Sequence, residues 1–225
     1  MCIRDRELPG EQNPLVASRV LGKTALLEFR TQKEGTSTDL KTLQIQRLSI
    51  KELIEQYSFA EKSQNDDNFL YVIQDDLKEI EQKLNYSSTS NDLYGRLIEI
   101  KKYVDKEITN LFIKTELSGK DLINAGRRQE QTNKNWEVLL NFSNSGGEKF
   151  AEITKSIAGT NQLLAIILDG ESISEASVGN QFANTGITGG SATISGNFSA
   201  ENARELEVQL KGCLLYTSSE PTRPY

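Results

Sequence analysis

The sequence predicts an α+β fold, a split βαβ (ferredoxin-like) two-layer sandwich that carries an inserted α-helical hairpin. Apolar and polar residues alternate from Trp136 to Phe142, as in a strand with one buried face. The continuous apolar run Leu163–Leu168 is typical of a strand covered on both faces. Between residues 35 and 114, long polar segments carry leucine and isoleucine at helical spacing, which indicates the inserted helices.

The two ends of the chain are expected to be foreign to the rest. Met1–Asp5 can be encoded by ATG TGT ATA AGA GAC, the reverse complement of a stretch of TGT CTC TTA TAC ACA TCT, which encodes Cys213–Ser218. Opposite strands of one short DNA at both ends resemble a transposon-end adapter ligated to a genomic insert. Residues 1–6 and 213–225 are therefore set aside, as tags are. Residues 7–212 remain, and we interpret them as an internal fragment.

A short helix and a strand are expected first in this fragment. Asn13-Pro14 begins a helix with Val16 and Val20 near helical spacing, and Gly22 ends it. Residues 24–30 are then predicted to form a strand, with Leu27 and Phe29 on one face and Leu26 and Glu28 on the other.

Three helices with apolar seams are predicted between residues 35 and 114. The seams are Leu40, Leu43, Leu48, Leu53 and Ile54 in the first, Leu70, Ile73, Leu77, Ile80 and Leu84 in the second, and Leu93, Leu97, Ile100, Val104, Ile108 and Leu111 in the third. The second seam is a heptad, and a Ser-rich turn precedes the third. The second and third helices are expected to pair as an antiparallel hairpin. For this hairpin the role of a spacer or of a layer packed on the domain is favoured over that of a partner-binding arm.

The remainder of the fragment is predicted to alternate strands and helices. Ser145–Glu148 has the pattern of a capping box, which begins a helix ending at Gly159. Asp169-Gly170 predicts a hairpin turn between the apolar strand and a strand from Ile173 to about Val178. After the glycine-rich loop 185–190 come a strand and a helix, which Ser199 caps and Gly212 ends.

Composition excludes several classes of function. The chain has 225 residues, a net charge of −6 and no His, so it lacks the usual general base and the usual zinc ligand. The largest basic cluster is Arg127-Arg128, which gives no electrostatic footprint for nucleic acid. The longest apolar run, Leu163–Leu168, is far shorter than the roughly 18 to 20 residues of a spanning helix.

Two glycine motifs are considered as anion sites and set aside. Gly186, Gly189 and Gly190 could cradle an oxyanion, but their spacing fits no phosphate-binding pattern and a strand follows them, so turn geometry is favoured. Gly146-Gly147 begins a helix, and we assign it to capping because the Glu148 carboxylate takes the anion's place.

A carboxylate cluster is considered as an acid–base site. Asp169, Glu171 and Glu175 could supply the two carboxylates of a glycosidase. All three lie on or beside one predicted hairpin, where turn propensity and a solvated strand face explain them. We therefore expect no enzyme activity, no metal or cofactor and no small-molecule substrate.

Several motifs, in register, resemble the SecD family of protein-export subunits. Leu8-Pro9-Gly10 and the stretch from Arg19 to Arg30 are similar to its LPG and LGxTAxLEFR segments. The later matches are Leu117-Ser118-Gly119, Asn144–Gly147 with Phe150, Leu168–Gly170, Thr185–Gly190 and Ala203–Leu206. The resemblance covers residues 8–30 and 116–212; the helices between match no motif, although long insertions at this point are similar to those of cyanobacterial-type members.

The resemblance implies an extracytoplasmic domain, between the first two membrane helices of a multi-pass subunit of the bacterial cell membrane. It implies a base subdomain that includes residues 7–34, an insertion at 35–114, and a mobile head at 115–212 whose last helix leads back toward the base. The implied partners are SecF, a SecYEG-type channel and unfolded exported polypeptides. The proton-carrying carboxylates of such a subunit lie in membrane helices outside these residues, so no catalytic residue is implied.

An unfolded client could add as a strand to a sheet edge or lie in an apolar groove. The strand from Ile173 to Val178 and the glycine loop, with Gly186, Gly189 and Gly190, are the candidates for the polypeptide contact or for a hinge. The alternative function is a structural module whose helical hairpin mediates assembly with a protein partner, distinguished by its heptad seam. An enzyme with a carboxylate pair ranks behind both.

Overall fold

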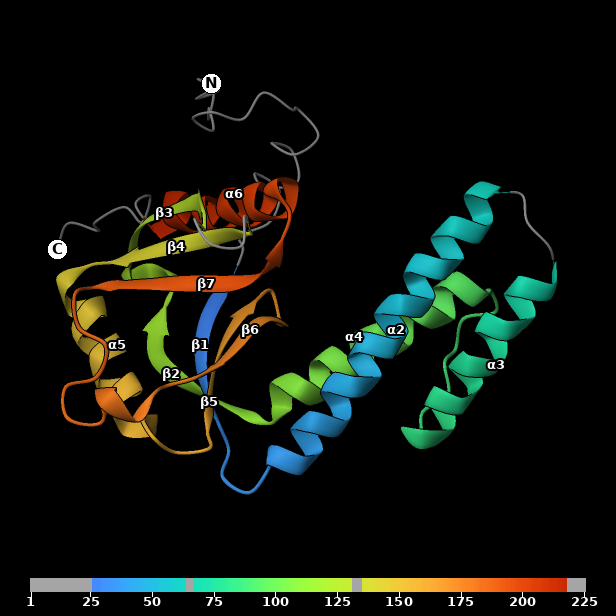
Figure 1. Cartoon of the computed structure of the whole chain (residues 1–225), viewed down its shortest axis with the longest axis horizontal. Coiled ribbons are helices and arrows are strands. Elements are labelled where there is room, and N and C mark those ends of the chain that lie inside the picture. Colours follow the sequence, from blue (N-terminus) through green and yellow to red (C-terminus); the bar gives the residue numbers. More distant parts are fainter. Residues whose placement is uncertain (1–25, 64–66, 131–134, 218–225) are drawn as a thin grey trace, which may run out of the picture. The chain divides into compact units, whose positions relative to one another are not determined.

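The computed structural model describes residues 26–63, 67–130 and 135–217 (Figure 1). The predicted helix at 13–22 and most of the predicted foreign ends lie outside these residues. The chain divides into two compact units. Of the described residues, unit 1 comprises those within 26–31, 114–169 and 173–217, and unit 2 comprises those within 32–113 and 170–172. No helix of the described residues is long and apolar enough to cross a membrane.

The strands β1 to β7 form two sheets. The first has the order β2 (Phe112–Ser118), β1 (Leu27–Gln32), β5 (Leu163–Leu168) and β6 (Glu171–Ser177). The second has the order β3 (Leu122–Gln129), β4 (Trp136–Phe142) and β7 (Ser191–Phe198). β1 pairs with β5 in antiparallel register, with Phe29 opposite Ile166, and β4 is antiparallel to both β3 and β7.

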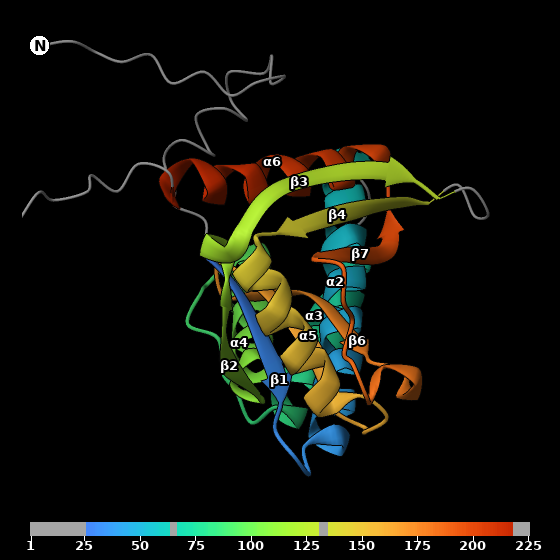
Figure 2. The same cartoon turned by 90° about the vertical axis from the view of Figure 1, so that its left-hand side faces the viewer.

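Two helices cover these sheets around one core. α6 (Ala200–Thr217) packs on β3 and β4, and α5 (Asn144–Ile157) contacts β4 and β5 (Figures 1 and 2). Two single turns of 3-10 helix, η1 (Gly119–Asp121) and η2 (Asn180–Phe182), lie in the connections. The ring of Phe142 contacts those of Phe29, at 5.5 Å between centroids, and Phe150, at 5.1 Å. The first sheet, the second sheet and α5 therefore share one apolar core.

The predicted mixture of helices and sheets is confirmed, and the strands expected at 136–142 and 163–168 are present. The single sheet of a split βαβ sandwich is not confirmed. β4 and β7 pair with each other in one sheet, whereas β5 and β6 belong to the other. Alternation along a strand predicts which face is buried, but it does not specify which strands pair.

Two predicted helix boundaries are wrong. α5 begins at Asn144, and its cap is Ser143, whose Oγ accepts a hydrogen bond from the Gly146 amide at 3.1 Å, rather than Ser145. α6 begins after Ser199, as expected, with that Oγ accepting from the Asn202 amide at 3.1 Å. It continues through Gly212 to Thr217, because one interior glycine costs a helix about 1 kcal/mol and does not end it.

Unit 2 contains the three predicted helices, α2 (Ser37–Ser63), α3 (Asp67–Lys83) and α4 (Leu93–Asn110). However, α2 packs on both of the others more extensively than α3 and α4, the expected hairpin, pack on each other, and its contact with α4 is the most extensive in the unit. The seams of α3 and α4 form its core: Ile73, Leu77, Ile80, Leu97, Ile100, Val104 and Ile108 are buried. Leu48 is 59% exposed, contrary to prediction, and Ile50 is buried instead. Spacings of three and four from Leu40 and Leu43 lead to 47 and 50, not 48.

Candidate functional site

β6 forms one edge of the four-stranded sheet and carries the first predicted contact residues. Ile173 is half-buried against the core of unit 1. Val178 directly follows the strand and is only 6% exposed, and its carbonyl oxygen accepts a hydrogen bond from the Gly159 amide at 3.0 Å. Ile173 therefore packs partly on the core at the start of this edge strand, whereas Val178 anchors its end.

The turn that leads into β6 has the predicted hairpin geometry. Asp169 and Gly170 have φ values of +52° and +86°, which a two-residue hairpin with both central residues in the left-handed region requires. Asp169 Oδ1 accepts from the Leu26 amide at 2.8 Å, and the Asp169 amide donates to the Leu26 carbonyl at 3.0 Å. This carboxylate joins the turn to the start of β1, which accounts for it without catalysis.

Glu171 belongs to a separate charged cluster within unit 2. Lys101 Nζ lies 2.7 Å from Glu171 Oε1 and 2.8 Å from Asp105 Oδ2. Burial raises the pKa of Asp105 above its ordinary value, and the hydrogen bond from Lys101 offsets only part of that. Burial alone would lower the pKa of Lys101, but its hydrogen bonds to Asp105 and Glu171 outweigh it and raise that pKa. Asp169 and Glu171 thus make different contacts, Asp169 with the Leu26 main chain and Glu171 with Lys101.

The glycine loop is packed tightly against α5. Gly186 has a φ of +68°, and a Cβ there would lie 1.8 Å from the Ala151 carbonyl oxygen. Thr154 is fully buried, and its Oγ accepts from the Ile187 amide at 2.8 Å and donates to the Phe150 carbonyl at 2.7 Å. These contacts support the turn interpretation, because the loop needs glycine for its backbone conformation and for close approach to the helix.

The predicted contact residues occupy two different places. Gly189 and Gly190, both with positive φ, line a groove of about 380 Å³ with the first turns of α5, and this groove includes neither Ile173 nor Val178. The Gly190 carbonyl also accepts from the Phe142 amide at 2.8 Å, which joins the loop to the end of β4. The structure therefore assigns the glycine loop to the surface around α5 and the strand residues to the edge of the sheet.

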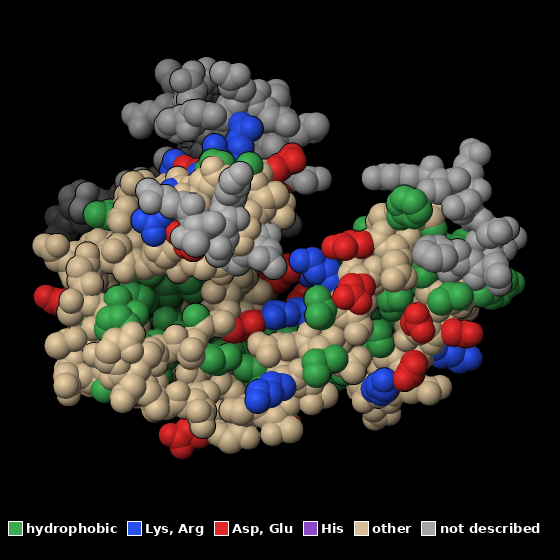
Figure 3. Space-filling model, viewed as in Figure 1, with side chains coloured by type: hydrophobic (Ala, Val, Ile, Leu, Met, Phe, Trp, Pro, Cys, Tyr) green, Lys and Arg blue, Asp and Glu red, His purple; other side chains and the backbone are tan. Residues whose placement is uncertain are grey.

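Apolar side chains also line a hollow of unit 1. Figure 3 shows them on the left of the view, below β7. Among the partly buried apolar residues that pack on the core are Ile173 of β6, Phe182 of η2 and Ile187 of the glycine loop.

A buried ion-pair cluster on β1 and β2 was missed by sequence reasoning. Glu28 is 5% exposed; Lys114 Nζ lies 2.6 Å from its Oε1, and Arg30 Nε lies 2.9 Å from its Oε2. Burial alone would raise the pKa of Glu28, but the hydrogen bonds from Lys114 and Arg30 outweigh it and hold that pKa below its ordinary value. The sequence held a signal for one half of this cluster, because Glu28 and Arg30 are two residues apart on a strand and so share a face, but none for Lys114.

The heptad seam of α3 does not face outward. Ile73, Leu77 and Ile80 are buried within unit 2 itself. The feature that distinguished the assembly-module interpretation is therefore part of the core. Within the described residues, no group of three or more His, Cys, Asp or Glu side chains is arranged to hold a metal ion.

Comparison with known proteins gives concordant matches. Residues 98–216 match the family model described as SecDF, P1 head subdomain. The chain is 53% identical over 207 residues to the protein translocase subunit SecD of Prochlorococcus marinus, an alignment that covers 92% of this chain and 42% of the relative. It is 37% identical over 206 residues to SecD of Synechocystis, with 92% and 39% covered. The chain thus spans about two fifths of the length of these relatives.

A solved structure of SecDF, described as a membrane component that enhances protein export, has a similar fold. The TM-score is 0.52 at 25% identity, and the match covers 92% of this chain and 71% of that one. The likeness therefore extends over both units, including the helices for which the sequence motifs gave no match.

Proposed function

Because the chain belongs to the SecDF family, through its match to the P1 head subdomain, we propose that it is an extracytoplasmic part of a SecD-type subunit and that it holds or steers the translocating polypeptide. The whole subunit would lie in the bacterial cell membrane, beside SecF and a SecYEG-type channel. It would act in late export driven by the proton-motive force. The relatives are named translocase subunits, and the proposal assigns no catalytic residue.

The edge position of β6 is the observation that carries the polypeptide-holding role. A strand at a sheet edge presents main-chain donors and acceptors to which an extended peptide can add. Main-chain hydrogen bonds do not depend on side-chain identity. Strand addition therefore suits a subunit that handles exported chains of many different sequences.

The composition of β6 is consistent with strand addition. Its second half, Ser174 to Ser177, carries small or short polar side chains except at Glu175. The neighbouring strand β5 is wholly apolar and almost wholly buried, so the sheet to which a client strand would add is anchored in the core. Ile173, half-buried at the start of the strand, would supply one apolar contact for an alternate client side chain.

Site-specific photo-crosslinking in the full-length subunit during export tests this role. A photoreactive residue at Ser174 or Ala176 is expected to form adducts with an arrested precursor. The same residue at Lys155, on the exposed face of α5, serves as the matched control and is expected to form few or none. Absence of precursor adducts along the whole of β6, or equal adducts at Lys155, would overturn the strand-addition role.

A further inference from the structure

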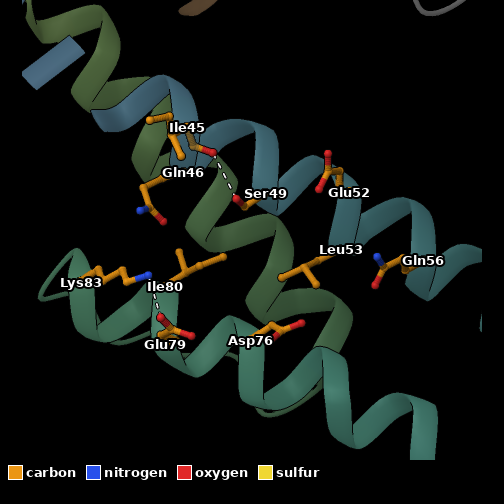
Figure 4. Close-up of a pocket in the computed structure, with 10 residues that line it drawn as sticks. All are labelled: Ile45, Gln46, Ser49, Glu52, Leu53, Gln56, Asp76, Glu79, Ile80 and Lys83. Atoms are coloured by element: carbon orange, nitrogen blue, oxygen red, sulfur yellow. Dashed lines mark hydrogen bonds and ion pairs between the residues drawn. The ribbon is translucent and has the colours of Figure 1, made fainter. Parts of the chain in front are cut away.

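The surface between α2 and α3 forms a groove within unit 2 that the proposed function does not use. It has a volume of about 280 Å³, and its lining residues project from both helices (Figure 4). Leu53 of α2 and Ile80 of α3 are nearly buried and give it an apolar floor. Ile45 lies at one end and is 63% exposed.

The apolar surface extends beyond the groove along α2. Leu48, three residues from Ile45, lies on the same side of the helix and is 59% exposed. Two large aliphatic side chains exposed together on one helix face, next to an apolar floor, form a surface that would lose contact with water if another helix packed on it.

The charge of the groove is negative. Lys83 Nζ pairs with Glu79 Oε1 at 2.7 Å, so these two groups neutralise each other. Glu52 and Asp76 also line the groove, and neither makes an ion pair with any part of the chain that the structure describes. Two uncompensated carboxylates beside exposed isoleucine and leucine favour a basic, amphipathic occupant.

We propose that the α2–α3 groove binds a cationic amphipathic helix of a partner protein. The lining of α2 runs from Ile45 to Gln56, a stretch of 12 residues that spans about 16 Å of helix and fits a partner helix of about three turns. Apolar residues of that helix pack on Ile45 and Ile80, and its lysines or arginines lie beside Glu52 and Asp76. A second copy of this chain is disfavoured because the chain carries a net charge of −6, and anionic lipid would likewise be repelled.

A peptide-binding experiment on the full chain tests the proposal. The probe is a fluorescently labelled helical peptide of about 12 residues with leucines on one face and lysines on the other, and its counterpart has glutamate in place of lysine. Fluorescence anisotropy is expected to show saturable binding of the lysine peptide that weakens as salt rises from about 50 to about 300 mM. The glutamate peptide is expected not to bind.

Matched variants then locate the binding site. The double variant Glu52→Gln with Asp76→Asn is expected to bind the lysine peptide about 3- to 10-fold more weakly, which corresponds to the loss of two exposed ion pairs. The control, Glu55→Gln with Asp75→Asn, removes the same charge from exposed positions outside the groove and is expected to change affinity less than about 2-fold. Equal losses in both pairs would show a general charge effect and overturn the groove as the site.

The apolar contact has its own control. Ile45→Ser is expected to weaken the lysine peptide about 5-fold or more, since it removes an exposed side chain that the peptide would bury. Ile123→Ser alters an equally exposed isoleucine, at 64%, on β3 of unit 1, and it is expected to have little effect. Binding of the glutamate peptide, or indifference of the lysine peptide to Ile45→Ser, would contradict the proposal.

Discussion

Thr154→Val tests how the glycine loop is fastened to α5. Threonine and valine have nearly the same shape, so the substitution leaves no cavity, but it removes the Oγ that bonds the Ile187 amide at 2.8 Å. The side chain is fully buried, and the amide would lose its partner in a place that water reaches poorly. A buried polar group left without its hydrogen bond costs about 1 to 3 kcal/mol.

We expect Thr154→Val to destabilise the protein by about 2 kcal/mol, which lowers the melting temperature by about 4 to 8 °C in a chain of this length. Amide hydrogen exchange should locate the change, with Ile187 exchanging faster. Ser156→Ala is the matched control, because this hydroxyl also bonds a helix carbonyl, that of Ile153 at 2.8 Å, but is exposed. If Thr154→Val has the same melting temperature as Ser156→Ala, and the Ile187 amide keeps its protection from hydrogen exchange, the loop is not held by this hydrogen bond and the reasoning is wrong.

Three further predictions concern stability. Gly186→Ala should destabilise the protein far more than Gly35→Ala. Both glycines have a φ near +70°, so each substitution costs about 1 to 2 kcal/mol, but only at Gly186 would the added Cβ overlap a carbonyl oxygen. Equal melting temperatures of the two variants would contradict this. Glu28, whose pKa is lowered in the fold, stabilises the protein at neutral pH, and this contribution is lost as pH falls through its folded pKa. Urea unfolding should therefore show that Glu28→Gln is less stable than the original protein at neutral pH and that the difference in unfolding free energy shrinks in acid. A difference that widens in acid would refute the prediction. Ile50→Ala should cost about 2 to 5 kcal/mol in chemical denaturation and Leu48→Ala less than about 0.5 kcal/mol, and the reverse order would show that the helix face is misassigned.

Sequence reasoning located the elements of this chain better than their pairing. Strands at 136–142 and 163–168 and the turn at Asp169-Gly170 followed from local rules, because burial, alternation and positive φ depend on neighbouring residues. The distribution of β4 and β5 into different sheets depends on contacts between residues far apart in the chain, which local patterns do not encode. Leu48 was misplaced for a local reason, since it lies one position from the continued seam.

The candidate site was predictable to a similar degree. The glycine loop was recognised as a turn, but its closeness to α5 is a tertiary contact that glycine spacing does not reveal. The buried Glu28 cluster needed Lys114, which follows the whole helical segment in the sequence. The edge position of β6 likewise depends on strand order. Such features become visible only when distant segments are brought together.

The helices of unit 2 are inserted between two strands that are hydrogen-bonded neighbours. The chain leaves β1 at Gln32 and returns to β2 at Phe112, and the Lys33 amide donates to the Leu111 carbonyl at 2.9 Å. The two ends of this long inserted segment thus lie as close together as the ends of a tight loop. Because the entropy of closing a loop grows only slowly with its length, such a site tolerates the gain or loss of a whole helical module. The junction is therefore a natural point at which lineages could lengthen or shorten this domain, and at which an engineer could graft another one.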